Sequence, residues 1–209
     1  MEDRNLHLGI TLIDVSVTEF PYDLKNVATQ DFGNLTAIYI MENEEGFAFI
    51  TKDFCEMNHI SVDELHMAAL DEQRKWGGYS INSMRSVLTA MAPELAGLSG
   101  TADEQMFVVT LDNAFRHGAS VILQPEVLIA IEELLGKDFY IIPSSIHEVL
   151  VIPDDGDVGM KAALDGMVKE INEIEVPPDE RLSDQVIRGS EFIRLLEARE
   201  GKIDRRWSH

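Results

Sequence analysis

The chain has 209 residues, 45% of them hydrophobic and 26% charged, which is the composition of a folded protein long enough to bury one sizeable core. Its 38 acidic and 17 basic side chains give a formal net charge of −21, which argues against direct binding of DNA or RNA. No apolar run approaches the about 20 residues of a membrane-spanning helix, and the single cysteine, Cys55, excludes a disulfide framework and a cysteine-based zinc site.

The first residues do not resemble a secretory signal. Met1 to Arg4 is acidic where a signal peptide is basic, and the apolar pattern of Leu6 to Val15 is interrupted by polar residues. We therefore expect a cytoplasmic protein.

The charge is unevenly distributed along the chain. Residues 1–180 hold 33 acidic and 10 basic side chains, whereas residues 181–209 hold 5 and 7. We predict an acidic domain over 1–180 and a helix-bearing C-terminal segment over 181–209 that packs on this domain or on a partner. The acidity is consistent with a solvated surface, and also with docking on a basic partner.

The first third of the chain predicts a strand followed by a hairpin. Leu6 to Val15 alternates polar and apolar residues, as expected of a strand with one buried face. Glu19 to Phe32 is weakly patterned and is compatible with a short helix plus a loop. Leu35 to Met41 and Phe47 to Thr51 are joined by a five-residue polar link, which favours a β-hairpin.

Two helices are predicted next. Ser61 and Glu64 have the spacing of a capping box, and Gly77-Gly78 ends the helix that they begin. Asn82 to Met91 has apolar residues on one helical face, and Leu95 to Glu104 resembles a loop.

The same order of strand pair and helix is predicted twice more. The second pair is Met106 to Leu111 with Ala119 to Gln124, and the helix from Pro125 to Gly136 follows it. The third pair is Phe139 to Ile142 with Val149 to Ile152, and the helix after it covers Met160 to Ile171. Because short links join antiparallel strands, the predicted fold class is α+β, with antiparallel sheets, helices packed on one face, and a helical C-terminal segment.

One segment resembles a known family signature. Residues 138–153 read Asp-Phe-Tyr-Ile-Ile-Pro-Ser-Ser-Ile-His-Glu-Val-Leu-Val-Ile-Pro, which is similar to an uncharacterised bacterial family frequent in gut anaerobes. Flanking segments from Leu35 to Asp184 resemble the same family in the same order. The resemblance implies no activity, substrate or cofactor.

The chain also departs from that family pattern. Family members usually carry a longer N-terminal region, so this chain resembles a short version or a C-terminal part. They also tend to place a tyrosine after the Leu-Ser-Asp motif, where this sequence has Val186-Ile187.

The strongest catalytic candidates lie within the signature. Ser145, His147 and Glu148 supply a hydroxyl, a potential base and a carboxylate within four positions, and in a strand Ser145 and His147 would point the same way. Hydrolysis also needs the imidazole within reach of the hydroxyl and donors for an oxyanion. A turn stabilised by the serine side chain explains the same residues, and we favour it.

The sequence predicts no cofactor site and no metal site. His59 with Asp63 or His66 lacks the spacing of known zinc motifs, and no phosphate-binding glycine loop is present. The leading hypothesis is a non-catalytic acidic module for protein–protein interaction, whose partner has a basic surface or is a second copy. The alternative is a hydrolase-type enzyme centred on Ser145, His147 and Glu148.

Overall fold

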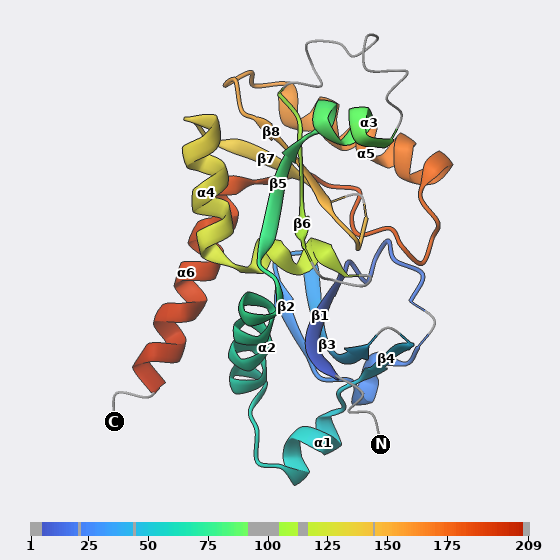
Figure 1. Ribbon diagram of the computed structural model, residues 1–209, viewed down its shortest axis with the longest axis vertical. Coiled ribbons are helices and arrows are strands. Elements are labelled where there is room, and N and C mark those ends of the chain that lie inside the picture. Colours follow the sequence, from blue (N-terminus) through green and yellow to red (C-terminus); the bar gives the residue numbers. More distant parts are fainter. Residues whose placement is uncertain are drawn as a thin grey trace.

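The strands of the protein form two antiparallel sheets in a computed structural model that describes residues 6–20, 22–43, 45–91, 105–112, 117–143 and 145–206. Figure 1 shows the two sheets one above the other along the long axis of the molecule. The predicted α+β class with antiparallel sheets and a C-terminal helix is confirmed.

The N-terminal sheet is built around one long central strand. Strand β3 (Leu35–Asn43) pairs along one edge with β1 (His7–Ile13). Its other edge is shared by β2 (Thr29–Phe32), which pairs with residues 35–38, and β4 (Gly46–Phe49), which pairs with residues 40–43. The predicted hairpin is therefore correct.

Short helices and one long helix accompany this sheet. The 3₁₀ helix η1 (Leu24–Asn26) precedes β2, and α1 (Lys52–Met57) follows β4. Helix α2 (Val62–Trp76) begins with the predicted capping box: the Ser61 hydroxyl accepts from the Glu64 N–H at 3.2 Å, and the Ser61 N–H donates to the Glu64 carboxylate at 2.8 Å.

The second sheet has the strand order β5-β6-β8-β7-β9. Its strands are β5 (Tyr79–Ser83), β6 (Phe107–Leu111), β7 (Phe139–Ile142), β8 (Val149–Pro153) and β9 (Ile187–Arg188). Helices α3 (Met84–Met91), α4 (Pro125–Leu135) and α5 (Met160–Glu175) surround it. The predicted pairing of β7 with β8 and the predicted helices α4 and α5 are confirmed.

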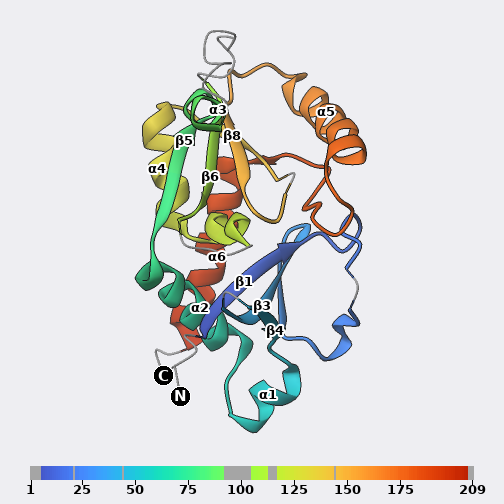
Figure 2. The ribbon, with the colours of Figure 1, turned by 45° about the vertical axis from the view of Figure 1, so that its right-hand side comes forward.

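Helices cover both faces of this second sheet, which differs from the expectation that they collect on one face. Alternate β7 residues point to opposite sides: Phe139 and Ile141 join the core cluster that includes α4, whereas Tyr140 and Ile142 contact Leu164 and other residues of α5. Figure 2 shows α4 and α5 on the two sides of the sheet.

The predicted strand Ala119–Gln124 is wrong. This segment is the 3₁₀ helix η4 (Gly118–Leu123), all six residues of which are buried. A short apolar run is compatible with a buried strand or a buried helix, so hydrophobicity alone did not distinguish the two. Strand β6 pairs instead with β5 and β8.

Three further features of the structure differ from the prediction. Residues 79–83 form β5, so α3 begins at Met84 and not at Asn82. The weakly patterned segment 19–32 contains strand β2 as well as a short helix. The Ile13 and Leu12 side chains both lie in cores, so β1 is buried on two faces. The predicted loop Leu95–Glu104 lies outside the described residues.

The C-terminal segment contributes to the main core. Helix α6 (Gly189–Arg206) places Phe192 and Leu196 in the same cluster as residues of both sheets, and Leu182 is fully buried there too. Figure 1 shows α6 running from the level of the second sheet down past α2. None of the helices described is both long and apolar enough to span a lipid bilayer.

Candidate functional site

A cavity of about 200 Å³ lies where the two sheets meet. Its walls combine aromatic, apolar and acidic side chains, and we call it the aromatic cavity. Its lining residues are Thr11, Ile13, Phe20, Tyr22, Phe47, Phe49, His117, Ile146, His147, Asp179 and Glu180. None of these described lining residues is a lysine or an arginine.

Six rings of the cavity contact one another in an unbroken series. The distances between ring centroids are 4.9 Å for Tyr22–Phe49, 5.4 Å for Phe20–Phe49 and 5.3 Å for Phe47–Phe49. Phe47 also lies 5.3 Å from His117, whose ring centroid is 6.5 Å from that of His147. The four Phe and Tyr contacts, including Phe20–Tyr22 at 5.5 Å, are edge-to-face, with interplanar angles of 63° to 74°. Inclined contacts of this kind are a favourable arrangement of aromatic rings, and none of the four is a face-to-face stack.

Strand β4 supplies two of these rings because of its periodicity. Phe47 and Phe49 are two positions apart, so both side chains project from the same face of the strand. Phe47 is 37% exposed, and Tyr22, which also contacts Phe49, is 53% exposed. Large aromatic surface therefore reaches solvent at the cavity mouth.

Backbone hydrogen bonds fix the loop that presents His147. The Ile146 N–H donates to the Glu180 carbonyl at 3.0 Å, and the Ile146 carbonyl accepts from the Ala119 N–H at 3.2 Å. The Thr110 hydroxyl donates to the His147 carbonyl at 2.9 Å. The loop is thus held by segments on both sides, which positions the imidazole against the cavity.

Gly118 permits the close approach of this loop to β6. A Cβ atom at Gly118 would overlap the Thr110 hydroxyl oxygen and the His147 carbonyl oxygen. Only a glycine leaves room for the hydrogen bond between those two groups, so the residue beside His117 is part of the construction of the cavity.

The acidic side of the cavity is anchored to the N-terminal sheet. The Glu19 N–H donates to the Pro178 carbonyl at 3.0 Å, and the Thr18 hydroxyl donates to the Arg181 carbonyl at 2.7 Å. The Asp14 carboxylate, which is 5% exposed, accepts from the Ser183 hydroxyl at 3.1 Å. These bonds join the loop before β2 to the loop that carries Asp179 and Glu180.

The three catalytic candidates occupy the loop between β7 and β8. The Ser145 hydroxyl accepts from the His147 backbone N–H at 3.0 Å, which is the geometry of a serine turn. The His147 imidazole Nε2 lies 3.6 Å from the Glu180 carboxylate. Glu148 is half-buried next to β8 and is not a lining residue of the cavity. The structure therefore directs His147, and not Ser145 or Glu148, into the cavity.

The residues considered for a metal site are spread over two elements. His59 lies between α1 and α2 with a positive φ of 56°, and Asp63 accepts a hydrogen bond from Gln30 at 3.0 Å. His66 is buried 3.1 Å from the Tyr39 hydroxyl. In the part of the chain that the structure describes, no three His, Cys, Asp or Glu side chains form a group that could hold a metal ion.

Burial controls the ionisation of this Tyr39–His66 pair. Desolvation, reinforced by the positive charge of Arg199, lowers the pKa of His66 to about 4, although Asp63 opposes the change. Desolvation also raises the pKa of Tyr39 far above its usual range. Both groups are neutral near pH 7, which suits a structural hydrogen bond in the core.

Sequence reasoning missed most of the aromatic cavity. Phe20, Tyr22, Phe47, Phe49 and His117 come from three separate segments, and none forms a motif. The alternation of Phe47 and Phe49 is the one local signal, because it places two large rings on one face of a short strand.

The comparisons with known proteins identify a family but no activity. A family model described as a family of unknown function, DUF5688, matches residues 15–188, and the chain belongs to this family. The resemblance seen in the sequence, to a family of unknown function, is therefore confirmed. The searches of curated proteins and of solved structures returned no match. The matched range contains every aromatic residue and both carboxylates of the cavity.

Proposed function

We propose that this member of a family of unknown function is a cytoplasmic, non-catalytic module that binds a partner protein with a basic surface through the aromatic cavity. The observation that carries the proposal is the combination of exposed aromatic rings with two carboxylates in one cavity, on a chain of net charge −21. Aromatic side chains are enriched at the centres of protein interfaces, where they supply most of the binding free energy.

The charge of the protein favours a basic protein over other partners. A field of this sign attracts Lys- and Arg-rich surfaces and accelerates their association at low salt. The same field repels the phosphates of DNA and RNA, so direct binding of nucleic acid is not part of the proposal. A second copy of the chain would also bring net charge −21, which makes a basic partner the better match.

The contacts around Ser145 support the non-catalytic part of the proposal. Its hydroxyl accepts a hydrogen bond from the backbone of its own turn, and the His147 imidazole lies 3.6 Å from the Glu180 carboxylate. A turn of this kind positions a loop without any need for nucleophilic chemistry.

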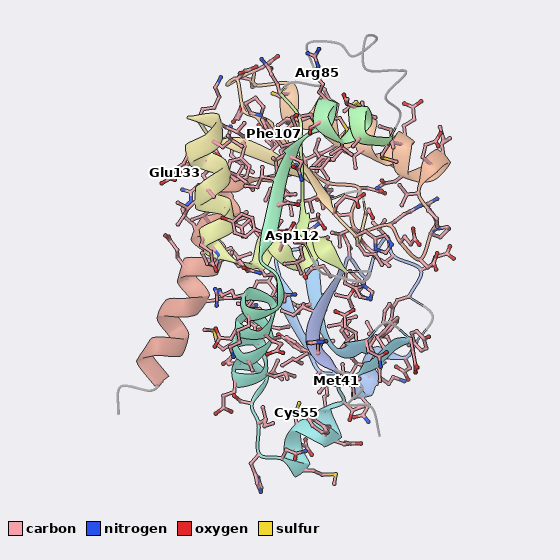
Figure 3. All side chains as sticks on the ribbon, in the orientation of Figure 1. Met41, Cys55, Arg85, Phe107, Asp112 and Glu133 are labelled. Carbon is pink, nitrogen blue, oxygen red and sulfur yellow. The ribbon has the colours of Figure 1, made fainter. Side chains whose placement is uncertain are left out.

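Affinity capture with matched charge variants tests this proposal. The wild-type protein, the double variant Asp179→Asn/Glu180→Gln and the double variant Glu132→Gln/Glu133→Gln are used as baits at low and high salt, and bound proteins are identified by mass spectrometry. Both variants lower the acidic charge by the same amount, but Glu132 and Glu133 lie exposed on α4, away from the cavity. Figure 3 shows Glu133 on α4, far from β4.

We expect a basic protein to be captured by the wild type and by the α4 variant, and to be lost with the cavity variant. Capture of the same protein by all three baits would contradict docking at the cavity. Failure of every bait to retain a basic protein at low salt would overturn the proposed function.

A further inference from the structure

We infer that the aromatic cavity receives a single arginine side chain of the partner; this inference rests on the proposed function and specifies what the cavity recognises. The four Phe and Tyr rings that line the cavity contact one another edge to face, so none of these contacts is a face-to-face stack. The face of an aromatic ring carries partial negative charge and attracts a cation within about 6 Å of its centre.

Two carboxylates complete the chemistry of a cation site. Asp179 and Glu180 line the cavity on the loop before Arg181, and the Glu180 carboxylate lies 3.6 Å from the His147 imidazole. Carboxylates accept charge-assisted hydrogen bonds from a guanidinium, often in pairs. A negatively charged ligand would meet ring faces and carboxylates together, and neither favours it.

The size and the apolar floor of the cavity fit a long side chain. A space of about 200 Å³ is many times the space that one water molecule needs, so a long side chain such as that of arginine can enter it. Ile13 and Ile146 also line the cavity and offer apolar surface to the three methylene groups of that side chain.

Arginine fits these features better than lysine. A guanidinium is planar, so it stacks on a ring face while its edge donates two hydrogen bonds to a carboxylate. An ammonium group is more strongly hydrated and is therefore harder to bring into a cavity walled by aromatic rings. The structure thus predicts a preference for arginine, and not a general affinity for positive charge.

The test uses three labelled peptides of eight identical residues, composed of arginine, lysine or citrulline, and measures their binding to the full chain by fluorescence anisotropy. Citrulline has the shape of arginine without its charge. We expect the arginine peptide to bind about 5- to 30-fold more tightly than the lysine peptide, because the guanidinium adds stacking and paired hydrogen bonds to the cation–π attraction that both side chains share, and the citrulline peptide to bind weakly.

Matched variants distinguish binding in the cavity from binding to acidic side chains elsewhere on the protein. Phe47→Ala and Tyr22→Ala keep the net charge and should each weaken arginine-peptide binding about tenfold. Phe54→Ala is the control, because Phe54 is 48% exposed on α1 and does not line the cavity. Glu180→Gln should weaken binding more than Glu133→Gln, which removes the same charge from α4. Thermal unfolding of each variant checks that it is folded.

Three results would overturn the inference. Equal binding of the arginine and lysine peptides, equal binding of the citrulline peptide, or unchanged affinity in both Phe47→Ala and Tyr22→Ala would each exclude an arginine site in the cavity. If the arginine and lysine peptides bind equally but Phe47→Ala weakens the binding of both, the proposed function survives without a specific arginine site. If neither basic peptide binds the wild type at low salt, both proposals fail.

Discussion

At the scale of single residues, Gly118 determines whether the cavity can form. Substituting Gly118→Ala inserts a methyl group where the Thr110 hydroxyl and the His147 carbonyl already lie, so the loop that carries His147 must move. Overpacking of this kind costs about 1–3 kcal/mol. We expect urea unfolding to show a loss of this size, together with weaker binding of a basic peptide.

The control for this prediction is Gly166→Ala, which adds the same methyl group in the middle of α5 with no atom within 4 Å. It should leave stability unchanged or raise it slightly, because alanine favours helix. Equal stability of Gly118→Ala and the wild type would show that the loop accommodates a side chain.

Substitution of Ser145 tests whether its hydroxyl stabilises a turn or acts as a catalytic nucleophile. Ser145→Ala removes the hydroxyl that accepts from the His147 N–H, and the loss of one such hydrogen bond should lower the free energy of unfolding by about 1 kcal/mol. Chemical denaturation measures this change. A hydrolytic activity that is lost in Ser145→Ala while the stability is unchanged would contradict this prediction and support the hydrolase hypothesis.

His66 gives the fold a defined dependence on pH. Its pKa of about 4 in the folded protein lies below the ordinary histidine pKa of about 6.5, so between these values the unfolded chain binds the proton and the folded chain does not. Stability should therefore fall as the pH drops from 6.5 to 4, by up to about 3 kcal/mol from this residue.

The measurement is the free energy of unfolding from pH 7 to pH 4 for the wild type and for His66→Gln, which lacks the titrating group. The stability difference between the two proteins should narrow as the pH falls, since carboxylate titrations contribute equally to both. Two curves that stay parallel across this range would contradict the assignment of a neutral buried His66.

At the scale of elements, α6 is predicted to be an integral part of the body. Leu196 is 3% exposed and belongs to the main core cluster, so Leu196→Ala should cost about 2–5 kcal/mol. Ile174→Ala on α5 is the matched control, because Ile174 is 70% exposed and its loss should cost less than about 0.5 kcal/mol. Urea unfolding measures the free energy of unfolding of both variants. A similar loss of stability in the two would show that the packing of α6 does not depend on Leu196.

The sequence predicted a helix correctly where residues at the ends of that helix mark its start and its end. The Ser61–Glu64 capping box and the Pro125 and Gly136 positions at the ends of α4 are visible in the sequence and are realised in the fold. The prediction for residues 118–123 was wrong because tertiary packing decides their secondary structure. An apolar run that is buried on all sides is compatible with the helix η4 as well as with a strand.

The candidate site was less predictable than the fold for a related reason. His147 was identified because it lies in a recognisable signature, but the neighbouring residues Phe47, His117 and Glu180 come from distant parts of the chain. Such contacts depend on strand order, and the order β5-β6-β8-β7-β9 does not follow the order of the sequence. The alternation of side chains along a strand places Phe47 and Phe49 on one face of β4, but it does not show which residues pack against that face.

At the scale of the whole molecule, the aromatic cavity lies at the junction of two sheets that share one core. Loops from both ends of the chain close around it, and the bonds from Glu19 to Pro178 and from Thr18 to Arg181 join them. The chain carries a net charge of −21, so long-range attraction and local recognition act on the same type of partner.

The most direct test of the central claim is to locate the binding site of the arginine peptide on the isotope-labelled protein by NMR titration. We expect the largest amide shifts at residues that line the cavity, namely Phe20, Tyr22, Phe47, Phe49, His117, Ile146, His147, Asp179 and Glu180. Shifts spread evenly over the acidic surface, or concentrated on another element such as α5, would contradict the assignment of the aromatic cavity as the docking site.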